Sequence, residues 1–176
     1  MKLVILAGGY GTRLTEETKI KPKPLVKIGN KPIIWHIMKI YSYFGINDFI
    51  VCLGYKGDLL KKELNKIKED WNITYVNTGL KTMTGGRIKR IKKHLQNDKY
   101  FCLSYGDGLC DVNLKKLINF HKKNKNLVTL TAVRPPARFG AIKIINNTVR
   151  YFKEKSSLDE GWINGGFFVI EPEIFK

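Results

Sequence analysis

The sequence predicts an open α/β fold: a mainly parallel sheet with helices on both faces and a small β-hairpin extension. Three observations predict it. Short apolar runs alternate with amphipathic stretches up to Val133, as a series of βαβ units requires. A glycine-rich loop follows the first apolar run directly. After Arg134-Pro135-Pro136 this alternation stops, and two strand-like runs flank Asn146-Asn147, which favours a hairpin.

The individual elements follow from apolar periodicity and from turn residues. Strands are predicted at residues 2–7, 48–53, 73–77, 100–104, 128–133, 141–145, 149–153 and 167–170. Helices are predicted at residues 33–44, 58–69, 87–95 and 114–124. Pro32 suits a first helical turn and Gly45 a helix end, while Asp58 and Asn113 are candidate N-caps. Right-handed crossovers between such strands produce a parallel sheet.

Length and composition predict one globular domain spanning residues 1–176, with 43% hydrophobic residues to form its core. Met1 leads directly into the first strand, which leaves no room for a signal peptide, and no apolar run approaches the roughly 18 residues of a membrane-spanning helix. Three cysteines without C-x-x-C spacing predict reduced thiols rather than disulfides or a zinc site. We therefore expect a cytoplasmic protein with no membrane partner.

The net charge of +17 admits two interpretations. A basic surplus can mark a nucleic-acid-binding protein. Here the lysines are spread over the whole chain, several of them on amphipathic helices, and no recognised nucleic-acid-binding motif accompanies them. Solvated helix faces that attract small polyanions are the favoured interpretation, so no nucleic-acid partner is expected.

The loop after the first strand has the composition of a phosphate-binding loop. Gly8, Gly9 and Gly11 allow main-chain N–H groups to approach an anion closely. Thr12 adds a hydroxyl, and Arg13 adds a fork of donors suited to phosphate oxygens. Further along the chain, a lysine at position 23 lies between two prolines that restrict where its ammonium can travel. The alternative is a strand-to-helix turn that merely packs tightly.

Two common phosphate-binding motifs are excluded. No G-x-x-x-x-G-K-[ST] spacing occurs. A dinucleotide fingerprint needs a third glycine where Leu14 stands, and it needs an acidic ribose ligand about 20 residues further on, where the chain has Gly29-Asn30-Lys31-Pro32.

Asp107 is the candidate metal ligand. It follows an apolar strand and lies between Gly106 and Gly108, which permit close approach of a bound group. A carboxylate facing a triphosphate is a natural Mg²⁺ ligand, because Mg²⁺ takes few protein oxygens and adds phosphate oxygens. Ligands of open α/β sheets bind at the carboxyl ends of the strands, so the glycine loop and Asp107 can share one crevice. The alternative is that Asp107 only closes a turn.

These motifs together carry a family resemblance. The pattern L-A-G-G-x-G-T-R-L followed by K-P-K-P-L resembles the signature of the sugar-1-phosphate nucleotidylyltransferases, and within that family it most resembles the glucose-1-phosphate cytidylyltransferases. The likeness extends in order through Trp35-His36-Ile37-Met38-Lys39-Ile40-Tyr41, Leu53-Gly54-Tyr55-Lys56-Gly57, Met83-Thr84-Gly85-Gly86-Arg87, Tyr105-Gly106-Asp107-Gly108 and Ile163-Asn164-Gly165-Gly166-Phe167-Phe168.

The resemblance implies a Rossmann-like fold of the nucleotide-diphospho-sugar transferase type. It implies transfer of a nucleotidyl group from CTP to glucose 1-phosphate, with Mg²⁺ held by Asp107. The product, CDP-glucose, would feed the synthesis of deoxysugars for surface polysaccharides such as the lipopolysaccharide O-antigen. Arg13 and Lys23 would be catalytic. The nucleotide would contact Leu6, Ala7, Gly8, Gly9, Gly11, Thr12, Arg13, Lys23, Thr82, Gly85, Gly86, Arg87, Gly106 and Asp107, and the sugar phosphate would contact Lys155 and Asn164.

The residues themselves leave alternatives open. Arg87 could be the first exposed residue of a helix, Lys155 a surface lysine and Asn164 a turn residue. The three histidines offer no ligand set: one, at position 36, is predicted to pack within its helix, while His94 and His121 are predicted to lie on exposed helix faces.

The chain ends at Lys176, whereas the resembling enzymes continue with a part that supplies a second magnesium carboxylate and much of an oligomerisation surface. We therefore expect a single nucleotidyltransferase domain that lacks this C-terminal part and that could form a homo-oligomer. The alternatives are a related thymidylyl- or uridylyltransferase, a nucleotide-binding module with weak turnover, and, less favoured, a nucleic-acid-binding protein.

Overall fold

The computed structural model describes residues 1–11, 20–135, 141–153 and 161–176. The chain forms two compact units. The first comprises Met1–Thr129 together with Phe167–Lys176, and the second comprises Leu130–Gly166.

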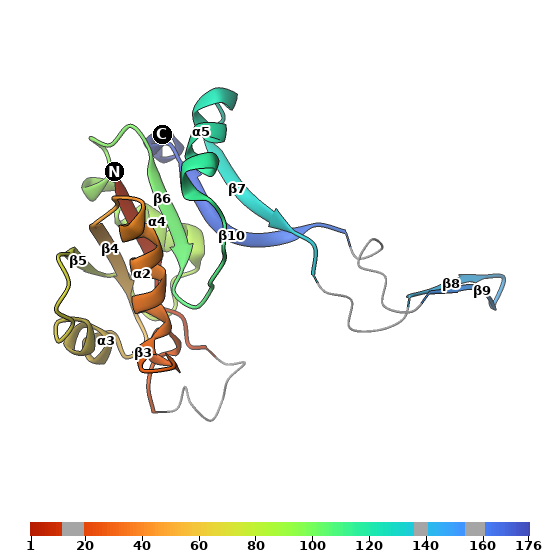
Figure 1. Ribbon diagram of the computed structural model, residues 1–176, viewed down its shortest axis with the longest axis horizontal. Coiled ribbons are helices and arrows are strands. Elements are labelled where there is room, and N and C mark those ends of the chain that lie inside the picture. Colours follow the sequence, from red (N-terminus) through yellow and green to blue (C-terminus); the bar gives the residue numbers. More distant parts are fainter. Residues whose placement is uncertain (12–19, 136–140, 154–160) are drawn as a thin grey trace. The chain divides into compact units, whose positions relative to one another are not determined.

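A six-stranded sheet has the order β5-β4-β1-β6-β10-β7 (Figure 1). Its strands are β5 (Asn72–Asn77), β4 (Asp48–Leu53), β1 (Lys2–Leu6), β6 (Phe101–Tyr105), β10 (Ile163–Ile170) and β7 (Val128–Val133). The first four pair in parallel, and β10 pairs antiparallel with β6. The predicted mainly parallel sheet is confirmed, and β1 lies between two parallel neighbours, so the loop that follows β1 has strand ends on both sides.

The two faces of the sheet carry separate apolar cores, because side chains alternate along each strand. Leu3 and Ile5 join one core with buried residues of α2 (Ile33–Tyr43), α3 (Gly57–Leu64) and α5 (Leu114–Asn124). Val4 joins the other core, which includes residues of α4 (Thr84–Arg90) and of the segment after it. Helices therefore cover both faces, as the sequence predicts.

Two helices show where local signals succeed. The helix α5 has the predicted bounds, because the Oδ1 of Asn113 accepts a 3.0 Å hydrogen bond from the Lys116 N–H and caps the first turn. The helix α2 ends one residue before its predicted end, ahead of Gly45, whose φ of +81° suits a helix terminus.

Two other helices differ from prediction. The predicted cap of α3 is wrong: its N-cap is Lys56, in the left-handed region, and Asp58 lies inside the first turn. This helix also stops at Leu64, before its predicted end at residue 69. The helix α4 starts three residues before its predicted start and gives way to the 3₁₀ turn η2 (Lys92–His94).

Short elements connect β1 to α2. A 3₁₀ turn, η1 (Lys23–Leu25), precedes β2 (Lys27–Ile28) and β3 (Lys31–Pro32), which pair antiparallel. Two residues of η1 are buried, so the turn is anchored to the body of the first unit. Near the C-terminus a further 3₁₀ turn, η3 (Pro172–Phe175), packs against the second core.

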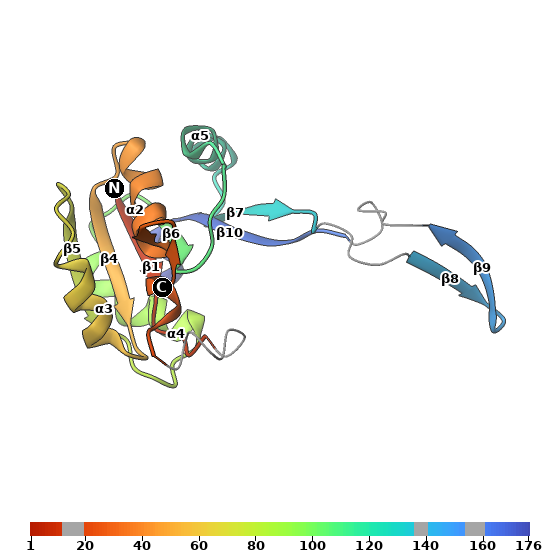
Figure 2. The same cartoon turned by 60° about the horizontal axis from the view of Figure 1, so that its bottom comes forward.

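The second unit contains the predicted hairpin, drawn as β8 and β9 in Figure 2. The strand β8 (Ala141–Ile145) pairs antiparallel with β9 (Thr148–Lys153). Asn146 and Asn147 join them with φ of +48° and +56°, the left-handed pair of a type I′ turn that asparagine tolerates. Within the residues that the structure describes, no helix is long and apolar enough to cross a bilayer.

Candidate active site

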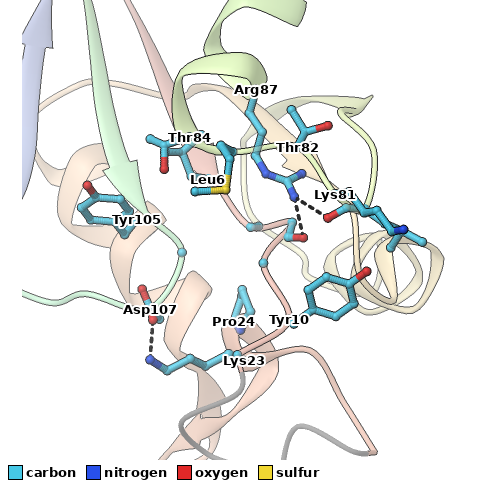
Figure 3. Close-up of a pocket in the computed structure, with 17 residues that line it drawn as sticks. Leu6, Tyr10, Lys23, Pro24, Lys81, Thr82, Thr84, Arg87, Tyr105 and Asp107 are labelled. Carbon is cyan, nitrogen blue, oxygen red and sulfur yellow. Dashed lines mark hydrogen bonds and ion pairs between the residues drawn. The ribbon is translucent and has the colours of Figure 1, made fainter.

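A cavity of about 380 Å³ opens at the carboxyl ends of β1 and β6 in the first unit (Figure 3). Its walls come from the loop after β1, the η1 turn, the segment leading into α4, and the residues after β6. The lining residues are Leu6, Ala7, Gly8, Gly9, Tyr10, Gly11, Lys23, Pro24, Leu80, Lys81, Thr82, Met83, Thr84, Arg87, Tyr105, Gly106 and Asp107.

The structure brings most of the predicted nucleotide site together in this cavity. The predicted residues that line it are Leu6, Ala7, Gly8, Gly9, Gly11, Lys23, Thr82, Arg87, Gly106 and Asp107. Gly85 and Gly86 lie in the first turn of α4 and are not among the lining residues. The glycine loop and the segment around Asp107 therefore do share one crevice.

The glycine loop is held by main-chain hydrogen bonds to the neighbouring strand. The N–H of Ala7 donates to the carbonyl of Cys52 at 3.1 Å, and the carbonyl of Gly8 accepts from the N–H of Tyr55 at 3.2 Å. Gly11 has a φ of +68°, which a residue with a Cβ adopts only at a cost. The loop thus begins as an extension of β1 and then turns at a position that needs glycine.

Lys23 and Asp107 meet across the cavity as an ion pair between Nζ and Oδ2 (Figure 3). Their side chains are 26% and 35% exposed, so a ligand in the cavity can reach both. Gly106 allows the close approach behind them: a Cβ there would lie 3.0 Å from the Cγ of Pro24 and 3.1 Å from the carbonyl of Leu6.

Arg87 is buried, and the interpretation as an exposed first residue of a helix is wrong. The residue is 5% exposed and lies within α4 rather than at its start. Its Nη1 donates to the hydroxyl of Thr78 at 2.6 Å, and its Nη2 donates to the carbonyl of Gly8 at 2.9 Å. Burial lowers the pKa of the guanidinium, although arginine stays charged. The segment that carries the cavity wall is therefore tied to the glycine loop.

Other predicted residues lie elsewhere. Thr12, Arg13 and Lys155 lie outside the described residues. Asn164 belongs to the second unit, where its Oδ1 accepts a 2.8 Å hydrogen bond from the N–H of Gly166. Its predicted contact with the sugar stays a prediction.

Several lining residues are absent from the predicted set. Tyr10 stands in the glycine loop with its ring 5.4 Å from that of Tyr55, and Lys81 and Thr84 flank the predicted Thr82. The motif pattern treats position 10 as variable, and nothing local distinguishes Lys81 from the many other lysines. For Lys81 and Thr84, proximity to Thr82 in the sequence was the only available signal.

One histidine is also in a different environment from its prediction. His121 is 1% exposed, and its Nδ1 lies 2.9 Å from the hydroxyl of Thr129. Burial lowers the pKa of His121, opposed by the carboxylate of Glu171. The expectation of an exposed face is wrong here, because the helix α5 turns this position toward β7 and the C-terminal segment.

The metal-binding capacity of the cavity rests on one carboxylate. Among the described residues, no three His, Cys, Asp or Glu side chains gather closely enough to hold a metal ion. Asp107 nevertheless accommodates a cation, since the Lys23 ammonium lies against it. This donor set fits an ion of the Mg²⁺ type that completes its shell with phosphate oxygens and water, rather than a closed protein cage.

These features define an open α/β protein with a glycine-lined cavity at the carboxyl ends of its central strands, the place where such folds bind nucleotides. The chain belongs to the nucleotidyl transferase family, which matches residues 2–176.

The chain is similar to individual members of this family over nearly its whole length. The chain is 48% identical over 196 aligned residues to the glucose-1-phosphate cytidylyltransferase of Salmonella typhimurium, covering 99% of this chain and 76% of that protein. It is 43% identical to the Bacillus subtilis homologue, with the same coverage. Among solved structures, HddC from Yersinia pseudotuberculosis complexed with GMP-PN is 27% identical, with a TM-score of 0.75 over 99% of this chain and 78% of that one.

Proposed function

We propose that this protein transfers a cytidylyl group from CTP to glucose 1-phosphate, releasing pyrophosphate and CDP-glucose. The observation that carries the proposal is the cavity in which a glycine loop faces Lys23 and Asp107, in a chain 48% identical to a glucose-1-phosphate cytidylyltransferase. CDP-glucose would supply deoxysugars for surface polysaccharides, and the reaction would take place in the cytoplasm.

The chemistry explains why the site needs no nucleophilic side chain. A phosphate oxygen of glucose 1-phosphate attacks the α-phosphorus of CTP and forms a new P–O bond. The bond from the α-phosphorus to the α,β-bridging oxygen breaks, and pyrophosphate leaves with its electron pair. The attacking oxygen is already ionised near neutral pH, so no general base is required. Catalysis then depends on positioning the two substrates and on stabilising the developing negative charge.

The residues divide this work. Main-chain N–H groups of the glycine loop would donate to phosphate oxygens, and Lys23 would contact the α-phosphate or the incoming sugar phosphate. Arg13 and Thr12 would add donors near the leaving group. Asp107 would hold Mg²⁺, which when bound neutralises phosphate charge. The exposure of the Lys23–Asp107 pair supports these roles, because both groups can exchange their mutual contact for substrate and ion.

The proposed contacts with the base rest on the cavity wall, and those with the sugar phosphate rest on the resemblance to the family. Thr82 in the cavity wall, with Gly85 and Gly86 of α4, would lie beside the cytosine. Arg87 would serve the nucleotide through the glycine loop, whose Gly8 carbonyl accepts a hydrogen bond from its guanidinium. Lys155 and Asn164 would serve the sugar phosphate. Mg²⁺ as the cofactor, association into a homo-oligomer, and the absence of membrane and nucleic-acid partners complete the proposal.

The direct test is a pyrophosphate-release assay with glucose 1-phosphate, Mg²⁺ and each of CTP, dTTP, UTP, ATP and GTP, with reactions lacking the sugar phosphate as controls. Sugar-dependent release that is selective for CTP is expected. Selectivity for dTTP or UTP would reassign the base, and nucleotide binding without release would identify a binding module instead. Tight binding of DNA or RNA that weakens steeply with salt would favour a nucleic-acid role.

A further inference from the structure

Arg87 joins three loops that follow parallel strands. Its acceptors among the described residues are uncharged: the carbonyl of Gly8 after β1, the carbonyl of Leu53 at the end of β4, and the hydroxyl of Thr78 together with the carbonyl of Leu80 after β5. The two terminal nitrogens thus each donate twice. Burying a cation against neutral acceptors costs folding free energy, so we ask which function the buried guanidinium serves.

Two glycines of the sequence motifs make room for this guanidinium. A Cβ at Gly8 would lie 2.1 Å from the Nη1 of Arg87, and a Cβ at Gly54 would lie 2.9 Å from the same atom and 2.4 Å from the carbonyl oxygen of Gly8. Neither glycine has a positive φ. Gly8 is therefore required for space around Arg87, and Gly54 for space around both Arg87 and the Gly8 carbonyl, rather than for backbone conformation.

The contact determines how the glycine loop presents its amides. The peptide bond between Gly8 and Gly9 is trans, as no described peptide bond is cis, so its carbonyl and its N–H point in opposite directions. The carbonyl of Gly8 is held by two donors, the Nη2 of Arg87 and the N–H of Tyr55. Gly9 lines the cavity, and its N–H is directed away from Arg87 because it points opposite to the Gly8 carbonyl.

The geometry points to Arg87 as a positioning residue for phosphate binding: its guanidinium fixes the Gly8–Gly9 peptide so that the Gly9 N–H is offered to a phosphate oxygen of the nucleotide. This inference rests on the proposed function, in which the nucleotide phosphates lie on the glycine loop. It differs from a role for Arg87 in reading the base, because the effect passes through the loop and reaches the phosphates.

The test compares Arg87→Gln and Arg87→Lys with the wild type, using three probes: CTP, inorganic pyrophosphate and cytidine. Lys89→Gln is the matched control, since it removes a cation from an exposed position of the same helix. Both Arg87 variants are expected to bind CTP and pyrophosphate on the order of tenfold more weakly, the loss of about one good hydrogen bond to a charged group, and to bind cytidine unchanged. An equal loss for CTP and cytidine, or no loss for either phosphate probe, would overturn the inference.

A second variant and a second readout guard against misfolding of the Arg87 variants. Gly54→Ala retains Arg87 but crowds both the guanidinium and the Gly8 carbonyl, and it is expected to weaken pyrophosphate binding selectively as well. In protein labelled with ¹⁵N-glycine, pyrophosphate should shift the Gly9 amide resonance in the wild type and in Lys89→Gln, and much less in Gly54→Ala. An equal shift in Gly54→Ala would contradict the inference. If the wild type itself bound neither CTP nor pyrophosphate, the proposed function would fail first.

Discussion

Replacing Asp107 by asparagine separates catalysis from stability. Asparagine has nearly the same shape and keeps an oxygen for Lys23, but it loses the negative charge. The ion pair that it weakens is partly exposed, so its loss costs at most about 1 kcal/mol of unfolding free energy, or roughly 2–4 °C in melting temperature. A preorganised electrostatic contact at a reacting phosphate is worth on the order of 10²–10³ in rate. The Asp107→Asn variant is therefore expected to remain folded and to lose most of its turnover.

The assay follows pyrophosphate release with CTP and glucose 1-phosphate across a magnesium titration, alongside a thermal melt. The half-saturating Mg²⁺ concentration is expected to rise as the maximal rate falls. Asp111→Asn is the control, because Asp111 is exposed and lies four residues further along the same loop. A folded Asp107→Asn protein with the wild-type rate and the wild-type magnesium dependence would refute the assignment.

Four further predictions follow from particular residues. Arg13→Ala should abolish pyrophosphate release without changing the melting temperature, and near-normal turnover would remove Arg13 from the site. Asn113→Ala should lower the unfolding free energy by about 1 kcal/mol in a urea titration, since it removes the cap of α5. Burial lowers the pKa of His121, so the folded state binds a proton at this residue less readily than the unfolded state. The free energy of unfolding should therefore fall as the pH drops below about 6.5, and it should depend less steeply on pH in His121→Gln. In a thiol titration of the native protein, only Cys110 should react. Cys52 and Cys102 are protected, because burial raises the pKa of each thiol to about 12. Rapid reaction of all three cysteines without denaturant would contradict the burial of Cys52 and Cys102 in the core.

Local sequence signals predicted the elements that local chemistry determines. The Asn113 cap specifies the start of α5, and the Asn146-Asn147 pair specifies a type I′ turn, because each acts on its own backbone. The strand β4 has its predicted bounds, since a continuous apolar run between polar residues leaves one place for a doubly buried strand. The position of the site also follows from the sequence, because the loop after β1 and the residues after β6 must meet where parallel strands end.

The failures involve contacts between distant parts of the chain. Burial of Arg87 depends on acceptors 79 and 34 positions away, at Gly8 and Leu53, and no local pattern encodes them. The environment of His121 depends on Glu171, which the fold brings to 3.7 Å from it. The prediction of the α3 N-cap failed for a different reason. Lys56, in the left-handed conformation, is the N-cap, so the helix begins one residue before Asp58.

A crystal structure with CTP and Mg²⁺ tests most directly where the triphosphate lies. We expect phosphate oxygens against the main-chain N–H groups that follow β1, with the ion between them and the carboxylate of Asp107. Nucleotide bound at another place on the protein, or a metal ion held away from Asp107, would contradict the proposed site.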